Sequence, residues 1–161
     1  MMNSMFPVEI NNRASSILKL CKKKCVTIVT AESCTGGLIA ACLTEIPGSS
    51  SVIDGGFVTY SNQAKMSMLS VKLEQLDHYG AVSEEVARSM AEGALGSSAA
   101  DIAIACTGVA GPGGATNTKP IGLVHLSCAL RMHPTLHKSC NFSGERSTIR
   151  LATVKAAFGL I

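Results

Sequence analysis

The sequence predicts a single α/β domain, a three-layer α/β/α sandwich around a mostly parallel mixed sheet. Short apolar, β-branched stretches alternate with segments of helical period along the 161 residues, which is typical of helices packed on both faces of a sheet. Two such stretches near the C-terminus follow each other directly and predict a hairpin, the antiparallel element of the sheet. A chain of this length buries about two-thirds of its unfolded surface in one core, so residues 1–161 form one domain.

The first half of the chain begins with a helix and then alternates strands and helices. Apolar residues three and four apart predict the opening helix, and a short β-branched run predicts the buried strand that follows. Gly55 and Gly56 inside the second strand indicate a bulge or a close backbone approach. We expect helices at 10–24, 38–43 and 64–69 and strands at 26–29 and 52–60.

The second half continues this alternation and ends in the hairpin and a helix. Ser83, followed by Glu84 and Glu85, predicts a capped helix that reaches Leu95, because acidic residues in the first turn favour the helix dipole. We expect strands at 102–106, 121–130 and 136–142 and a last helix at 144–160.

Composition and charge argue against several function classes. The 14 Lys and Arg nearly balance the 11 Asp and Glu, and only Lys22–Lys24 cluster, so we expect no nucleic-acid partner. Seven cysteines is an odd number, and MMNSMFPVEI has no leader-peptide pattern, so we expect reduced thiols and a cytoplasmic protein. The four histidines show no zinc-type spacing with cysteines, and every apolar stretch is too short for a membrane span. We therefore expect no metal, no cofactor and no membrane partner.

The segment TAESCTGG, residues 30–37, joins a predicted strand to a predicted helix and places Ser33 at the junction. Helix N–H groups and the helix dipole favour an oxyanion or phosphate at such a point, and two glycines allow close approach of a ligand. Two interpretations stay open for Ser33: a nucleophile, or a helix cap, a role that Thr35 could equally take. Cys34 is either a second candidate nucleophile or a small buried apolar residue.

Polar residues also follow the second predicted strand, in YSNQAK at residues 60–65. Because ligands bind beyond the carboxyl ends of parallel strands, we expect Tyr60, Asn62 and Lys65 to face Ser33. A lysine acts as a base when desolvation or a nearby cation lowers its pKa. From spacing alone, Lys65 is either that base or a solvated helix residue.

A second glycine-rich loop, TGVAGPGG at residues 107–114, follows the strand predicted at 102–106 and can line the same pocket. It lacks the GxxxxGK[ST] and GxGxxG spacings, so it is neither a P-loop nor a dinucleotide fingerprint. No GxSxG elbow or SxxK motif surrounds Ser33.

These motifs together resemble the CinA C-terminal domain family, whose stand-alone members are nicotinamide-nucleotide amidohydrolases. The resemblance rests on TAESCTGG, PGSS (47–50), GFVTYSNQAK (56–65), YGAVSEEV (79–86), TGVAGPGG, KPIG (119–122) and FSGERSTIR (142–150), in family order. The loop ATNT (115–118) and Leu123 depart from the commoner family pattern. These departures leave Ser33 and Lys65 intact, so they affect the expected substrate contacts more than the expected chemistry.

The resemblance implies hydrolysis of nicotinamide mononucleotide to nicotinic acid mononucleotide and ammonia, within pyridine nucleotide recycling. It implies Ser33 as nucleophile, Lys65 as base and Tyr60 as the residue that orients or relays the proton. Substrate contacts are expected from Thr35, Gly36, Gly37, Asn62, Thr107, Gly108 and Arg146, with backbone N–H groups near 35–37 as the oxyanion hole. The resemblance also implies a homodimer. A non-catalytic protein-interaction domain associated with competence is the alternative.

Overall fold

The computed structural model describes residues 4–161 of the chain. Residues 1–3 lie outside the described residues. They are part of the predicted domain 1–161 and of the N-terminal stretch in which we expect no leader peptide.

One five-stranded sheet with the order β2-β1-β3-β4-β5 forms the centre of the molecule. Its strands are β1 (Ile28–Glu32), β2 (Ile53–Val58), β3 (Ile102–Gly108), β4 (Leu123–Leu130) and β5 (Leu136–Asn141). β1 pairs in parallel with both β2 and β3, whereas β4 pairs antiparallel with β3 and with β5. Only β4 therefore runs against the other strands, which confirms the mostly parallel mixed sheet and the hairpin.

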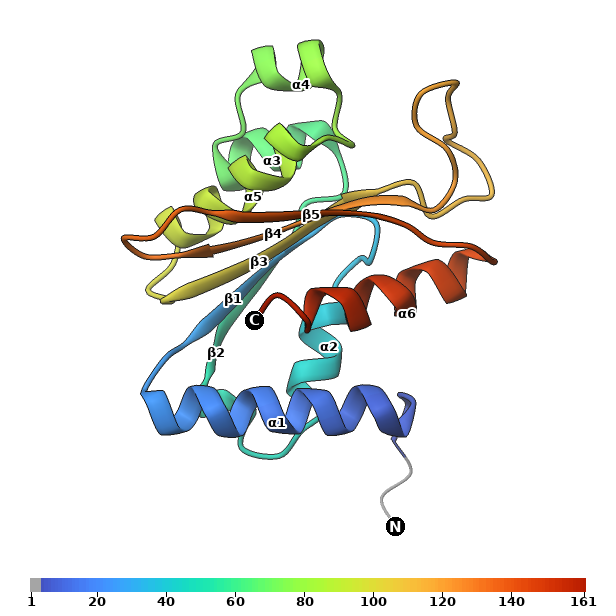
Figure 1. Ribbon diagram of the computed structural model, residues 1–161. Coiled ribbons are helices and arrows are strands. Elements are labelled where there is room, and N and C mark those ends of the chain that lie inside the picture. Colours follow the sequence, from blue (N-terminus) through green and yellow to red (C-terminus); the bar gives the residue numbers. More distant parts are fainter. Residues whose placement is uncertain (1–3) are drawn as a thin grey trace.

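Helices cover both faces of this sheet (Figure 1). On one face lie α1 (Val8–Lys24), α2 (Leu38–Thr44) and α6 (Arg146–Ala157), and on the other lie α3 (Asn62–Leu69), α4 (Leu73–Tyr79) and α5 (Glu84–Gly96). A single 3₁₀ turn, η1 (Ser49–Ser51), precedes β2. The arrangement confirms the predicted three-layer α/β/α sandwich.

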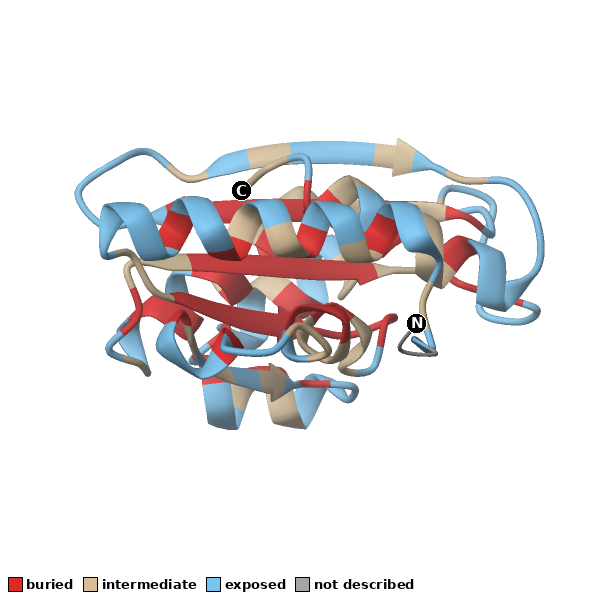
Figure 2. Cartoon of the chain, turned by 90° about the horizontal axis from the view of Figure 1, so that it is seen from below, coloured by how far each residue is buried: buried red, intermediate tan, exposed pale blue. Residues whose placement is uncertain are grey.

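The sheet separates two apolar clusters, one under each helical layer. Ile28 and Ile104 pack with α1, α2 and α6, whereas Val29 and Ala103 pack with α3, α4 and α5. All five residues of β1 are buried, and Figure 2 shows the central strands as the most buried part of the chain. A strand with apolar neighbours on both faces reads as a continuous apolar run, which explains why its sequence does not alternate.

Two features of the strands differ from the sequence prediction. β1 begins two residues later and ends at Glu32, and β3 continues to Gly108, so the first three residues of TAESCTGG and the first two of TGVAGPGG belong to strands. The expected irregularity in β2 is present: the pairing with β1 skips Asp54, and a Cβ on Gly56 would lie 2.7 Å from the Thr30 hydroxyl oxygen.

No pattern in the sequence predicts α4. This helix has seven residues, no side-chain cap and one buried residue, Leu76. Its apolar pattern is therefore too short to be recognised from periodicity, and packing against α5 stabilises it.

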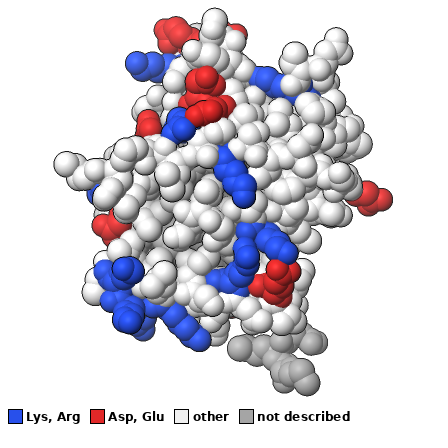
Figure 3. Space-filling model, in the orientation of Figure 1, with Lys and Arg blue, Asp and Glu red and all other residues white. Residues whose placement is uncertain are grey.

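The charges are spread over the surface. On the face in Figure 3, basic side chains gather at the end of α1, whose last turn holds Lys22, Lys23 and Lys24, and other charges are dispersed. Among residues 4–161, no helix is long and apolar enough to cross a membrane.

Candidate active site

The carboxyl ends of β1, β2 and β3 meet at one edge of the sheet and bring together three segments that are distant in sequence. β1 leads into the Ser33 turn, which we define as residues Ser33–Gly37, and α2 follows this turn. The Ser33 N–H donates to the carbonyl of Cys106 on β3 at 3.1 Å. This bond fixes the start of the turn against the neighbouring strand.

Glu32, the last residue of β1, holds the Ser33 turn through its buried carboxylate. Its carboxylate is fully buried and accepts three hydrogen bonds: from the Thr35 hydroxyl at 2.6 Å, the Ile39 N–H at 2.9 Å and the Ala40 N–H at 2.8 Å. Two of these donors are otherwise unpaired N–H groups of the first turn of α2. Glu32 therefore supplies the side-chain hydrogen bonds at the start of α2, whose N-cap residue is Gly37. The interpretation of Ser33 or Thr35 as the cap is wrong, since neither side chain accepts from the helix.

Lys65 comes from α3, where the Ser61 side chain caps the helix by accepting from the Ala64 N–H at 3.0 Å. The Lys65 side chain is 1 % exposed and extends toward the Ser33 turn. Its Nζ donates to Ser33 Oγ at 3.0 Å and to the Thr59 carbonyl at 2.8 Å. Lys65 is thus a buried residue beside Ser33, and its interpretation as a solvated helix residue is wrong.

Burial also shifts the pKa of this lysine. Removal from water lowers the pKa of the Lys65 amine below its ordinary value, and the Cys34 and Cys106 sulfurs oppose that shift. No described residue forms a carboxylate salt bridge with Lys65. The neutral amine, which is the form able to accept a proton, is therefore populated at a lower pH than in a solvated lysine.

Cys34 lies next to Ser33 but has a different environment. Its side chain is 6 % exposed, and a hydrogen bond with the Cys106 thiol, together with burial, raises the pKa of Cys34 well above its usual value. A protonated, buried thiol is a poor nucleophile. The structure favours the alternative interpretation of Cys34 as a small buried residue.

Tyr60 and Arg146 form the outer wall of the site. The Tyr60 hydroxyl accepts from Arg146 Nη2 at 2.8 Å, and Arg146 Nη1 donates to the Gly111 carbonyl at 2.7 Å. Tyr60 is 60 % exposed, and its hydroxyl has no hydrogen bond to Ser33 or Lys65 among the described residues. Its predicted role, to orient or relay the proton between Ser33 and Lys65, stays a prediction.

A cavity of about 280 Å³ lies between these segments. The predicted site residues that line it are Ser33, Tyr60, Asn62, Lys65, Thr107, Gly108 and Arg146. Thr35, Gly36 and Gly37 do not line it, because Glu32 holds the Thr35 side chain in the interior and the Gly36 N–H donates back to the Ser33 carbonyl at 3.0 Å. Of the predicted oxyanion donors, the Gly36 N–H is therefore already used within the turn.

Thr107 and Gly108, which line the cavity, also contact neighbouring segments in ways that the sequence did not predict. The Thr107 hydroxyl donates to the Ala81 carbonyl at 2.8 Å and connects β3 to the segment before α5. A Cβ on Gly108 would lie 2.7 Å from the Leu123 carbonyl oxygen, so a larger residue would disturb the pairing of β3 with β4.

Arg150 on α6 also contacts the Ser33 turn and was not predicted to do so. Its Nη2 donates to the Thr35 carbonyl at 2.6 Å, so the turn is held by Glu32 from inside and by an arginine from α6. The motif FSGERSTIR contains this residue, but a backbone contact across 115 positions leaves no signal in a single sequence.

The chemical capability of the site follows from this geometry. A serine hydroxyl hydrogen-bonded to a buried amine is the arrangement of an activated serine nucleophile in which lysine replaces histidine as base. No group of three or more His, Cys, Asp or Glu side chains placed to hold a metal ion occurs in residues 4–161.

Comparison with known proteins identifies the family. The model of the CinA C-terminal domain matches residues 10–161. The chain belongs to the CinA C-terminal domain family. This confirms the resemblance inferred from the motifs.

Solved structures of CinA proteins share the fold. The competence/damage inducible protein CihA from Agrobacterium tumefaciens is 50 % identical, with a TM-score of 0.95 over 97 % of this chain and 95 % of that one. A CinA superfamily protein from Escherichia coli is 33 % identical, with a TM-score of 0.90 over 98 % of this chain and 92 % of that one.

Curated relatives are longer proteins. A putative competence-damage inducible protein of Caldicellulosiruptor saccharolyticus is 48 % identical over 145 residues, which is 90 % of this chain and 35 % of that protein. A CinA-like protein of Endomicrobium trichonymphae is 45 % identical over 99 % of this chain and 37 % of its own length. The chain thus spans about a third of these relatives.

Proposed function

We propose that this CinA domain is an amidohydrolase that converts nicotinamide mononucleotide to nicotinic acid mononucleotide and ammonia. The single observation that carries the proposal is the 3.0 Å hydrogen bond between Lys65 Nζ and Ser33 Oγ in a buried site open to a cavity. The family resemblance indicates which substrate to test, and the Ser33–Lys65 pair supports the type of reaction.

In the first half of the reaction, the neutral Lys65 amine takes the Ser33 proton as Ser33 Oγ attacks the carboxamide carbon. The Thr59 carbonyl accepts an Nζ hydrogen at 2.8 Å, which leaves the lone pair of the neutral amine for the Ser33 hydroxyl proton. The resulting oxyanion is stabilised by backbone N–H groups of the Ser33 turn. The N–H group of Cys34 suits this role, since Cys34 lines the cavity and its N–H donates to no carbonyl among the described residues.

The tetrahedral intermediate then collapses. The carbon–nitrogen bond breaks, the Lys65 ammonium returns its proton to the leaving nitrogen, and ammonia departs from an ester on Ser33. In the second half, Lys65 accepts a proton from water as that water attacks the ester. The bond to Ser33 Oγ breaks, the serine regains its proton and the carboxylate product leaves.

The phosphate of the mononucleotide requires cationic donors at the rim of the cavity. Arg146 lies there and uses two guanidinium N–H groups on Gly111 and Tyr60, which leaves three of its five donors. The bond with the Tyr60 hydroxyl holds the guanidinium in place. Asn62 supplies a neutral amide on the same wall.

The test is to incubate the purified chain with nicotinamide mononucleotide and measure ammonia and nicotinic acid mononucleotide together. Nicotinamide riboside serves as the comparison substrate, because it keeps the carboxamide and lacks the phosphate. We expect equimolar products from the mononucleotide and at least tenfold lower kcat/KM for the riboside. Absence of product from both compounds with folded protein would overturn the proposal and favour the non-catalytic interaction domain.

A further inference from the structure

A second cavity adjoins the Ser33 cavity. Its volume is about 640 Å³, against about 280 Å³ for the cavity at Ser33. Ala110, Gly111 and Arg146 line both, so the two cavities are neighbours with Arg146 at their boundary. Ligand pockets commonly measure about 300–1,000 Å³, so the second cavity alone has room for a nucleoside-sized group.

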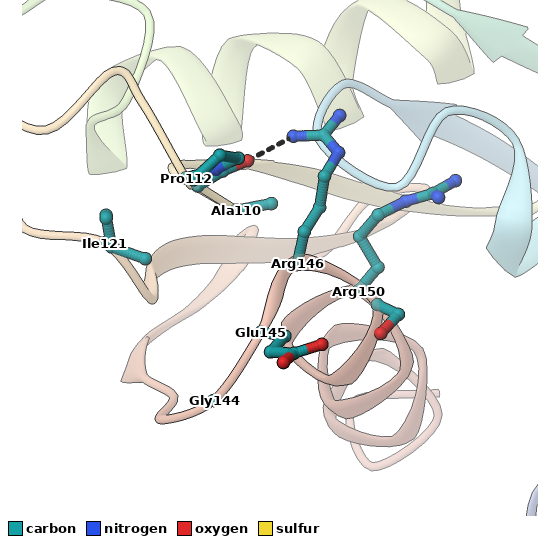
Figure 4. A pocket seen from close by; sticks show the side chains of 9 residues that line it. Ala110, Pro112, Ile121, Gly144, Glu145, Arg146 and Arg150 are labelled. Carbon is teal, nitrogen blue, oxygen red and sulfur yellow. Dashed lines mark hydrogen bonds between the residues drawn. The ribbon is translucent and has the colours of Figure 1, made fainter.

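The lining of the second cavity combines cations with an apolar wall. Arg146 and Arg150 extend from the start of α6, and Ile121 lies across the cavity from them (Figure 4). Ile121 is 40 % exposed, so its side chain is available to a ligand in the cavity. Pro112 adds to the apolar wall, and Glu145 and Ser147 supply oxygen atoms at the rim.

This combination matches the parts of a nucleotide. Guanidinium groups bind phosphate, an apolar wall packs against a base, and carboxylate or hydroxyl oxygens accept ribose hydroxyls. Arg150 uses one guanidinium donor, on the Thr35 carbonyl, and Arg146 keeps three. Arg146 lines both cavities and Arg150 contacts the Ser33 turn, so these cations suit the phosphates that join two nucleosides.

We propose that the second cavity binds the second nucleotide of a nicotinamide dinucleotide, so that the protein hydrolyses the carboxamide of the dinucleotide as well as that of the mononucleotide. This inference rests on the proposed function. The nicotinamide half occupies the Ser33 cavity, the pyrophosphate lies along Arg146 and Arg150, and the second base packs on Ile121 and Pro112. The reaction is the same: water replaces the amide nitrogen, and ammonia and the nicotinate dinucleotide are released.

Ile121 provides the discriminating substitution, because it lines the second cavity and not the first. Ile121→Glu places a carboxylate opposite the phosphates, and Ile121→Ala removes the apolar wall without adding charge. Val8→Glu is the matched control, since Val8 is 75 % exposed on the first turn of α1. Circular dichroism of each variant verifies folding.

Two measurements test the proposal. In calorimetry, adenosine 5′-monophosphate, which has no carboxamide, binds the parent and the Val8→Glu variant and binds Ile121→Glu at least tenfold more weakly, with Ile121→Ala between them. In the ammonia assay, Ile121→Glu lowers kcat/KM for the dinucleotide at least tenfold and changes that for the mononucleotide less than about twofold. A tenfold loss corresponds to about 1.4 kcal/mol.

The outcomes separate this proposal from the function on which it rests. No adenosine monophosphate binding by the parent, or equal losses for both substrates in Ile121→Glu, would overturn the second-nucleotide site. If the parent hydrolyses neither substrate but binds adenosine monophosphate in a manner sensitive to Ile121→Glu, the site stands and the proposed amidohydrolase function fails.

Discussion

The side-chain nitrogen of Lys65 lies 3.0 Å from the hydroxyl oxygen of Ser33, although 32 residues separate them in the chain. Ser33 follows β1 and Lys65 sits on the helix that follows β2, and β1 and β2 are parallel neighbours. The sheet topology therefore brings the two groups together, and the buried position of Lys65 removes the competing water.

Lys65→Met tests the base. Methionine keeps the length and apolar stem of lysine but cannot accept a proton, so we expect kcat for nicotinamide mononucleotide to fall by roughly a hundredfold to ten-thousandfold. Lys72→Met is the matched control, because Lys72 is exposed on the same face of the sheet, and we expect its kcat to match the parent. A folded Lys65→Met variant with near-parent kcat would remove Lys65 from the mechanism.

The pH dependence of activity should follow the same residue. Burial places the pKa of Lys65 below its usual value of 10.5, and only the neutral amine accepts the serine proton. Activity therefore rises with pH through that lowered pKa and falls as the solution is acidified below it. The logarithm of kcat/KM against pH measures this limb, with slope about one on its acid side. A flat profile across the range in which the protein stays folded would contradict the assignment.

Glu32→Gln tests the support of the Ser33 turn. Glutamine has the same shape, but its amide nitrogen cannot accept from the Thr35 hydroxyl or from the Ile39 and Ala40 N–H groups. At least one buried donor loses its acceptor, which costs about 1–3 kcal/mol of unfolding free energy in urea denaturation, with lower kcat.

The control for Glu32→Gln is Glu74→Gln, because Glu74 is exposed on α4. We expect its unfolding free energy to stay within about 0.5 kcal/mol of the parent. Equal stability and kcat for Glu32→Gln and the parent would show that the three hydrogen bonds do not organise the turn.

Gly93→Ala tests the packing of the helix that carries Lys65. A Cβ at Gly93 on α5 would overlap the carbonyl oxygen of Leu69 at the end of α3. We expect α3 to be displaced, the unfolding free energy to fall by several kcal/mol and activity to fall with it. Gly96→Ala in the same helix has open space around the added methyl and should be neutral or stabilise by up to about 1 kcal/mol in urea unfolding. Equal stabilities of the two variants would contradict this packing.

The proximity of Ser33 and Lys65 was predictable from the sequence because it depends on the topology of the sheet. Once the strand–helix order indicates a parallel sheet, residues after the strand ends share one edge, and Ser33 and Lys65 both follow strands. The role of Glu32 could not be predicted from the sequence. Its carboxylate accepts from the Ile39 N–H seven residues later, but in the sequence it resembles any acidic residue in a loop. The contacts from Arg150 to Thr35 and from Arg146 to Tyr60 join distant segments, which only the folded backbone brings together.

The identity of the nucleophile is the central claim, and ammonia release by Ser33→Ala and Cys34→Ala beside the parent tests it most directly. All three proteins are assayed with nicotinamide mononucleotide after circular dichroism has verified their fold. We predict that Ser33→Ala loses ammonia release and that Cys34→Ala retains it, since the Cys34 thiol is buried and its pKa is raised. Retained activity in Ser33→Ala, or its loss in a folded Cys34→Ala, would contradict the account.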